Sequence, residues 1–178
     1  MHRHFFKYLF LLFLLLGCSV KLLPTSQNKI ERLTFLLQSL DSSVSYEKSS
    51  MLSRDIFKQI EILTKRFKLT SPPLWHNFLV NVGVRNKGLC YHWSDALYLH
   101  LYDKKYESFS FYLVGSSIGN YFLEHNALLV VAKRAKSMQG GIVIDPWRES
   151  GKLYFSKVEE DTEYSWKHRK KREPFSPK

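Results

Sequence analysis

The sequence predicts an α+β fold in which helices come first and an antiparallel sheet follows. Two observations support this prediction. Up to Asp103, apolar residues recur at spacings of three and four, as they do along the buried face of a helix. From Phe109 onward, apolar residues such as Phe111 and Leu113 alternate with more polar ones, which is typical of a strand with one buried face. We therefore expect N-terminal helices packed against a sheet.

Four helical segments are expected before the strands. The most regular has Leu52, Ile56, Ile60 and Leu63 on one face, with basic residues largely on the other. Such a stripe predicts core packing, although a partner-binding surface has the same pattern. Two successive prolines end this helix and suit the first turn of the next. The expected helices cover residues 30–40, 52–67, 74–82 and 90–102.

The second half of the chain predicts the strands and then a tail. Strands are expected at residues 109–113, 121–132, 141–144 and 152–156. With the helices they form one domain over residues 29–164. Residues 165–178 contain a run of basic residues and two prolines, which predicts a disordered tail. Such a tail is either solvated or in contact with a negatively charged membrane or wall surface.

The N-terminus indicates export in a bacterial cell. Basic residues at its start precede nine apolar residues at positions 8–16, a run too short for a membrane span, which needs about 20 residues. The following Leu15-Leu16-Gly17-Cys18 resembles the bacterial lipobox, which implies that residues 1–17 are a signal peptide and that Cys18 is lipidated. An ordinary cleaved signal is the alternative. Ser19 rather than aspartate follows the cysteine, which favours an outer-membrane lipoprotein facing the periplasm.

Length and charge limit the function classes. Cleavage at Cys18 leaves 161 of the 178 residues, enough for one domain with a sizeable core, joined to the lipid by a tether over residues 18–28. The net charge of +11 in the full chain favours anionic envelope partners, whereas nucleic acid is not expected in that compartment. The sequence contains no pair of His or Cys residues at a spacing typical of zinc sites. It also contains no glycine-rich loop of the kind that binds phosphate. We expect neither a metal nor a cofactor.

Three residues in chain order predict a thiol-dependent active site. Cys90 follows the glycine turn at Gly88 and opens a predicted helix, where the helix dipole and free amide groups stabilise a thiolate. His125 lies near the start of one predicted strand and Asp145 at the end of another, so the two can be neighbours across a sheet. A nucleophile, a base and an acid that orients the base form the arrangement that acyl transfer through a thiol requires.

These motifs resemble the transglutaminase-like, papain-like cysteine enzymes over residues 88 to about 155, under half of the mature chain. The motifs that carry the resemblance are Gly88-x-Cys90-x-x-Trp93, His125-Asn126-Ala127-Leu128-Leu129-Val130 and Ile144-Asp145-Pro146-Trp147. The resemblance implies a cysteine peptidase or amidase, or a transglutaminase-like acyltransferase, with a Cys90–His125–Asp145 catalytic triad. The substrate does not follow from it; the expected location alone suggests a peptide, protein or cell-wall amide. Asn86, Trp93 and Trp147 are the candidates for oxyanion or substrate contacts.

Each member of the triad also has a simpler interpretation. Free cysteine is often a small buried hydrophobe, His125 could be a core histidine, and Asp145 before a proline could open a turn. His92 lies about 200° around the helix from Cys90 and should point away from it. The alternative function is therefore a non-catalytic binding or structural lipoprotein of the envelope on the same scaffold.

Overall fold

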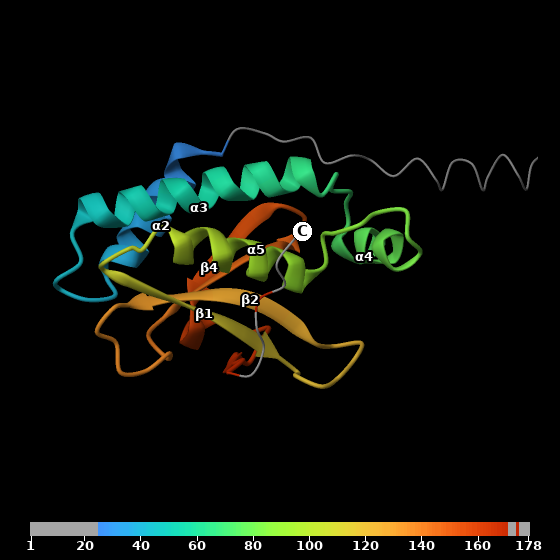
Figure 1. Ribbon diagram of the computed structural model, residues 1–178. Helices are drawn as coiled ribbons and strands as arrows, with labels where there is room; N and C mark the ends of the chain where they lie inside the picture. The colour runs from blue at the N-terminus through green and yellow to red at the C-terminus, as the bar shows by residue number, and fades with distance from the viewer. Residues whose placement is uncertain (1–24, 171–173, 175–178) are drawn as a thin grey trace, which may run out of the picture.

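A computed structural model describes residues 25–170 and residue 174 and has an α+β fold (Figure 1). Its helices are α2 (Gln27–Gln38), α3 (Tyr46–Arg66), α4 (Pro73–Asn81), α5 (Cys90–Asp103) and the short 3₁₀ helix η1 (Val158–Glu160). Its strands are β1 (Phe109–Ser116), β2 (His125–Ala132), β3 (Ile142–Glu149), β4 (Lys152–Lys157) and β5 (Lys167–His168). The prediction of helices followed by strands is confirmed.

The strands form one antiparallel sheet in the order β4-β3-β2-β1-β5. The longest pairing joins β1 and β2, from Phe109 opposite Ala132 to Ser116 opposite His125. Strands that are consecutive in the chain are neighbours in the sheet, apart from β5, which returns to the far edge of β1. This antiparallel sheet agrees with the prediction from the sequence.

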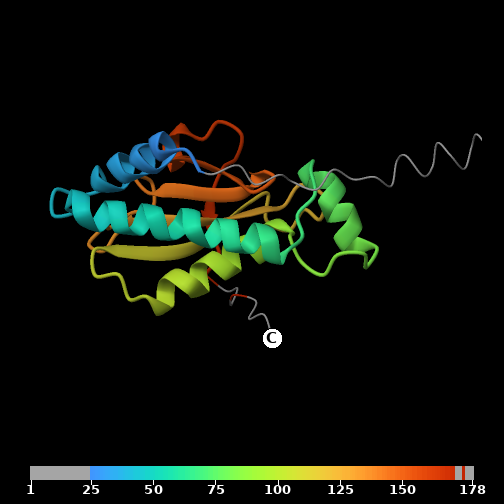
Figure 2. The same ribbon diagram turned by 90° about the horizontal axis from the view of Figure 1, so that it is seen from above.

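Helices α2, α3 and α5 cover one face of the sheet (Figure 1 and Figure 2). Alternate residues of β2, such as Leu128 and Val130, point to this face because successive side chains of a strand face opposite sides. The buried core between helices and sheet includes Leu33, Leu37, Leu52, Ile56, Ile60, Leu63, Trp93, Leu97, Leu101, Phe109, Ile142 and Ile144. The regular apolar stripe of α3 therefore lies in the core, as the first interpretation of it predicted.

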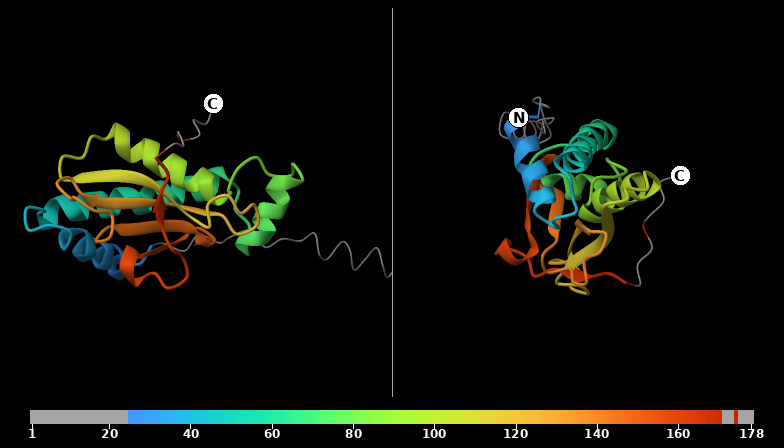
Figure 3. Two further views of the ribbon diagram at one scale, coloured as in Figure 1. Left: turned by 90° about the horizontal axis from the view of Figure 1, so that it is seen from below. Right: turned by 90° about the vertical axis from the view of Figure 1, so that its left-hand side faces the viewer.

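The opposite face of the sheet is partly covered by the C-terminal segment after β4 (Figure 3). Trp166 packs there against apolar residues of β1, β2 and β3, including Val114, Leu129 and Val143. Lys167 and His168 then pair with Gly115 and Val114 as β5. The expectation of a disordered tail from residue 165 thus differs from the structure up to residue 170, because a buried tryptophan and main-chain pairing hold this segment.

The ends of two elements also differ from the expected ones. Strand β2 begins at His125 and not at residue 121, because Asn120 closes a turn by accepting hydrogen bonds from the amides of Phe122, Leu123 and Glu124. Helix α2 begins at Gln27, inside the expected tether. The expected signal peptide and Cys18 lie outside the described residues. Among the residues that are described, no helix is both long enough and apolar enough to cross a membrane.

Candidate active site

The turn before α5 sets the position of Cys90, the first residue of that helix. Gly88 has φ +124°, a backbone conformation that side chains disfavour, and a Cβ there would lie 2.1 Å from Nε2 of His76. Only glycine fits this turn without moving the buried imidazole. The sequence signal Gly88-x-Cys90 therefore has a steric cause, which is the close approach of α4 to the turn.

Two histidines fix the same turn. His76 Nε2 donates to the Lys87 carbonyl at 2.9 Å, while its Nδ1 accepts from the Thr70 amide at 3.2 Å. Burial lowers the pKa of His76, although the hydrogen bond to Lys87 opposes this effect. His92 Nδ1 accepts from the amides of Gly88 and Leu89, each at 3.2 Å. These histidines thus hold the backbone in front of Cys90.

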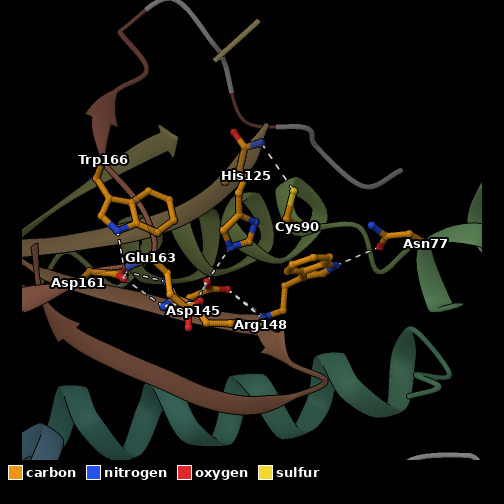
Figure 4. A network of polar contacts seen from close by, with 10 residues as sticks. Asn77, Cys90, His125, Asp145, Arg148, Asp161, Glu163 and Trp166 are labelled. Carbon is orange, nitrogen blue, oxygen red and sulfur yellow. Dashed lines mark hydrogen bonds and ion pairs between the residues drawn. The ribbon is translucent and has the colours of Figure 1, made fainter. Parts of the chain in front are cut away.

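His125, the first residue of β2, meets Asp145, which lies within β3 and not at its end as expected, because β3 continues to Glu149. His125 Nε2 lies 2.6 Å from Asp145 Oδ2, and both side chains are buried. Since the carboxylate can only accept, Nε2 carries the proton and Nδ1 remains for another partner. Figure 4 shows the His125 side chain between Asp145 and Cys90, and a hydrogen bond with Cys90 is among the causes that raise the pKa of His125. The structure brings together all three residues that the sequence singled out.

The electrostatics of His125 reflect both neighbours. Burial alone would lower the pKa of His125, but hydrogen bonds to Asp145 and Cys90 and the charges of these groups raise it to about 9. An imidazole with this pKa is protonated at neutral pH. Cys90 itself is only partly buried, so it is not the fully buried hydrophobe of the simpler interpretation. A protonated imidazole next to a thiolate is a ready nucleophile and proton donor.

Four hydrogen bonds converge on Asp145. Its Oδ2 accepts from His125 and from Arg148 Nε at 3.1 Å, and its Oδ1 accepts from the amides of Trp147 and Arg148 at 3.2 and 3.3 Å. The carboxylate thus opens a turn with one oxygen and orients the histidine with the other. The simpler interpretation of Asp145 and the catalytic one both describe part of its contacts.

Arg148 joins this site to the C-terminal segment. Its guanidinium donates to both carboxylate oxygens of Asp161, at 3.2 and 2.7 Å, and lies over the rings of Tyr154 and Tyr164. Burial raises the pKa of Asp161, but hydrogen bonds from Arg148 and Trp166 outweigh this effect and lower it. Figure 4 shows that Arg148 links the carboxylate of Asp145 to that of Asp161. Nothing in the triad motifs predicted it.

Asn126 is a site residue that the sequence reasoning missed. Its side-chain Nδ2 lies 3.7 Å from Cys90 Sγ and 3.4 Å from Glu124 Oε1. Glu124 in turn accepts from the Gly119 amide at 2.8 Å and pairs with Arg169. The Asn126 side chain is buried, and its Oδ1 has no hydrogen-bond partner among the described residues. Apart from His125, Asn126 is the one polar residue of β2, and this was the signal that the sequence offered.

The three candidates for oxyanion or substrate contacts have different environments. Trp93 is buried in the core, where its Nε1 donates to the Gly88 carbonyl at 3.1 Å and its ring meets Phe67 edge to face. Trp147 packs against the His125 ring with centroids 4.8 Å apart and donates to Asn77 at 3.0 Å. Asn86 lines a cavity beside Arg66 and Lys68. Of the three, only Trp147 touches a member of the triad in the contacts above.

The histidine is also shielded by aromatic rings from the C-terminal segment. Tyr164 and Trp166 lie with their ring centroids 4.5 and 5.5 Å from that of His125. Together with Trp147 they surround the imidazole, which strengthens its interactions with Asp145 because water is excluded. Within residues 25–170, the structure contains no cluster of three or more His, Cys, Asp or Glu side chains that could hold a metal ion.

No protein-family model matches the chain, and no curated protein or solved structure matches it either.

Proposed function

We propose that this protein is a thiol-dependent amide or peptide hydrolase, or an acyltransferase, that acts through Cys90, His125 and Asp145. The observation that carries the proposal is the position of the His125 ring between the Cys90 thiol and the buried Asp145 carboxylate. The helix, strand and strand that supply the three residues agree with the transglutaminase-like, papain-like arrangement that the sequence resembles. A histidine that only stabilises the fold would not require a thiol beside its second ring nitrogen.

The reaction starts with attack of the Cys90 thiolate on a carbonyl carbon. The carbonyl π electrons move to the oxygen, and the resulting oxyanion accepts hydrogen bonds from the Cys90 amide, which is free at a helix N-terminus, and from Asn126 Nδ2. Collapse of this intermediate breaks the carbon–nitrogen bond, and the His125 imidazolium gives its proton to the leaving amine. A thioester on Cys90 remains.

The second half of the reaction returns the thiol. Neutral His125 takes a proton from water, or from an acceptor amine, as this nucleophile attacks the thioester carbonyl. Collapse releases the acid or the new amide, and the thiolate leaves beside the imidazolium. Asp145 keeps the proton on Nε2 throughout, so Nδ1 always faces the sulfur.

The proposed setting is the bacterial envelope, with the domain anchored as a lipoprotein through Cys18. Peptide stems of the cell wall and envelope proteins are the substrates that this location offers. The net charge of +11 in the full chain, of which Arg3 and Lys7 in the expected signal peptide carry two, suits an anionic surface of this kind.

Acyl transfer to the thiol tests the proposal directly. The purified full chain is incubated with an activated ester and with cell-wall peptides, and mass spectrometry locates the acyl group. We expect a thioester on Cys90, its absence in Cys90→Ala, and much slower formation in His125→Ala. Iodoacetamide should alkylate Cys90 at neutral pH faster than it alkylates a small-molecule thiol.

The alternative is a non-catalytic envelope-binding or structural lipoprotein on the same scaffold. It predicts that no acyl group reaches Cys90 from any ester or amide. It also predicts that alkylation of Cys90 is equally slow in the wild-type chain and in His125→Ala. Both results together would replace the enzyme with a binding protein.

A further inference from the structure

One end of the molecule exposes large apolar side chains on two separate elements. The loop between β1 and β2 presents Tyr121 and Phe122 at 86% and 90% exposure, values that leave these rings almost wholly in solvent. Apolar side chains also project from α4 and the turn after it. We call the combined surface the apolar rim; it consists of Leu74, Phe78, Val82, Val84, Ile118, Tyr121, Phe122 and Leu123.

The apolar rim lies at the end of the molecule that carries the candidate active site. Helix α5 begins at this end with Cys90, and the loop between β1 and β2 leads directly into His125. Figure 1, Figure 2 and Figure 3 all place α4 and this loop at the same end, opposite the loop between β2 and β3. Exposed apolar surface of this extent usually marks an interaction site.

Positive charge accompanies the apolar rim. Arg66, Lys68, Arg85 and Lys87 line a cavity of about 310 Å³ next to α4, and Val84 of the rim lines the same cavity. Glu124, which directly follows Leu123 of this loop, is paired with Arg169. Apolar side chains beside cations match a surface that has anionic groups above hydrocarbon.

We propose that the apolar rim docks on an anionic lipid bilayer and holds the Cys90 end of the molecule against it. The rim projects as a loop tip and a helix face, which suits insertion into an interface better than capture of a peptide in a groove. Seven residue-to-residue steps separate Cys18 from Thr25 and span at most about 25 Å, so a lipid on Cys18 would keep the domain within reach of the bilayer. Docking does not depend on the reactivity of the thiol.

The test reports the environment of the loop in the full chain bound to vesicles. A fluorescent nitrobenzoxadiazole label is placed at position 122 in Cys90→Ser/Phe122→Cys, and at the opposite end in Cys90→Ser/Gln139→Cys. Both proteins share the same N-terminus, so any labelling of Cys18 contributes equally. The vesicles contain phosphatidylethanolamine and phosphatidylglycerol, with either aqueous iodide or a spin-labelled lipid as the quencher.

Docking predicts opposite behaviour at the two positions. The label at position 122 should emit at shorter wavelength, be quenched by the spin-labelled lipid and be shielded from iodide, whereas the label at position 139 should be quenched by iodide. Shielding should weaken in high salt and in Arg66→Gln/Lys87→Gln, but not in the control Lys133→Gln/Lys136→Gln. Neutral glutamine is sufficient in these variants, because loss of two cations already removes much of the attraction to the anionic vesicles.

Two outcomes would overturn the proposal. If iodide quenches both labels equally on vesicles, the rim does not touch the bilayer. If the label at position 122 is shielded in native envelope membranes but not on pure lipid vesicles, the rim binds a protein partner instead.

Discussion

The two ring nitrogens of His125 have different neighbours, and this difference determines the chemistry that the residue can perform. Nε2 is bound to Asp145 at 2.6 Å, so in the proposed reaction the proton that moves is the one on Nδ1, beside Cys90. In this geometry Asp145 supplies orientation and charge without exchanging a proton itself.

The raised pKa of His125 can be measured by following its imidazole signals in NMR spectra as a function of pH. We expect a pKa of about 9 in the wild-type chain. In Asp145→Asn the pKa should fall, because the substitution removes a charge and a hydrogen bond that both favour the imidazolium. A wild-type pKa near the ordinary 6.5 would show that the Cys90–His125–Asp145 interaction does not form in solution.

Asn126 should matter for acylation and much less for alkylation of the same thiol. In Asn126→Leu, which keeps the shape of the side chain, we expect Cys90 to react with an activated ester about 100-fold more slowly, because one oxyanion donor is lost. Alkylation by iodoacetamide forms no oxyanion and should change little. Equal losses in both reactions would instead assign Asn126 to stabilising the thiolate.

At the scale of elements, the start of α5 is fixed by packing against α4. Gly88 combines a positive φ with a steric conflict, because a Cβ at this position would collide with His76. Gly83 also has a positive φ, +80°, but a Cβ added there would meet nothing within 4 Å. Gly83 is therefore a control position that isolates backbone strain from steric conflict.

Gly88→Ala should therefore destabilise the protein more than Gly83→Ala. Strain alone in the control should cost about 1 kcal/mol of the free energy of unfolding, and the conflict with His76 should add to it at position 88. Urea denaturation gives both values. Alkylation of the remaining folded Gly88→Ala protein should also slow, since the turn in front of Cys90 must move; comparable losses in the two variants would contradict this account.

Much of this architecture could be predicted from the sequence because local patterns determine it. Both apolar patterns reflect which face of an element is buried. Leu52, Ile56 and Ile60 are buried along α3, and Phe109 and Phe111 of the alternating segment are buried in the same core. The order of Cys90 and His125 along the chain likewise follows from a helix that precedes the sheet. The residue types and the elements that carry them were enough to nominate the triad.

The contacts that support the site could not be predicted in this way, because they join residues that are distant in the chain. Arg148 reaches Asp161, and Trp166 returns to cover the sheet, so a segment with the composition of a tail is ordered up to residue 170. Strand β2 begins later than its apolar run because Asn120 forms a turn with the amides that follow it. Such choices depend on tertiary contacts that override local preference.

For the molecule as a whole, the site connects its three layers. Cys90 belongs to the helical layer, His125 and Asp145 to the sheet, and Tyr164 to the C-terminal segment on the far face. Displacement of the helices, the sheet or the C-terminal segment should therefore change the pKa of His125. This coupling makes the pH dependence of global stability a readout of the site.

Stability should fall between neutral and alkaline pH because of His125. The pKa of its imidazole is about 9 in the folded protein against the ordinary 6.5 in an unfolded chain, so its contribution is fully present below pH 6.5 and is lost as the pH rises through 9. The difference corresponds to roughly 3 kcal/mol of the free energy of unfolding as an upper value. Denaturation of the wild type and of His125→Asn from pH 6 to pH 10 measures it. The wild type should lose its advantage over the variant across this range, and parallel curves would show that folding does not raise the pKa of the imidazole.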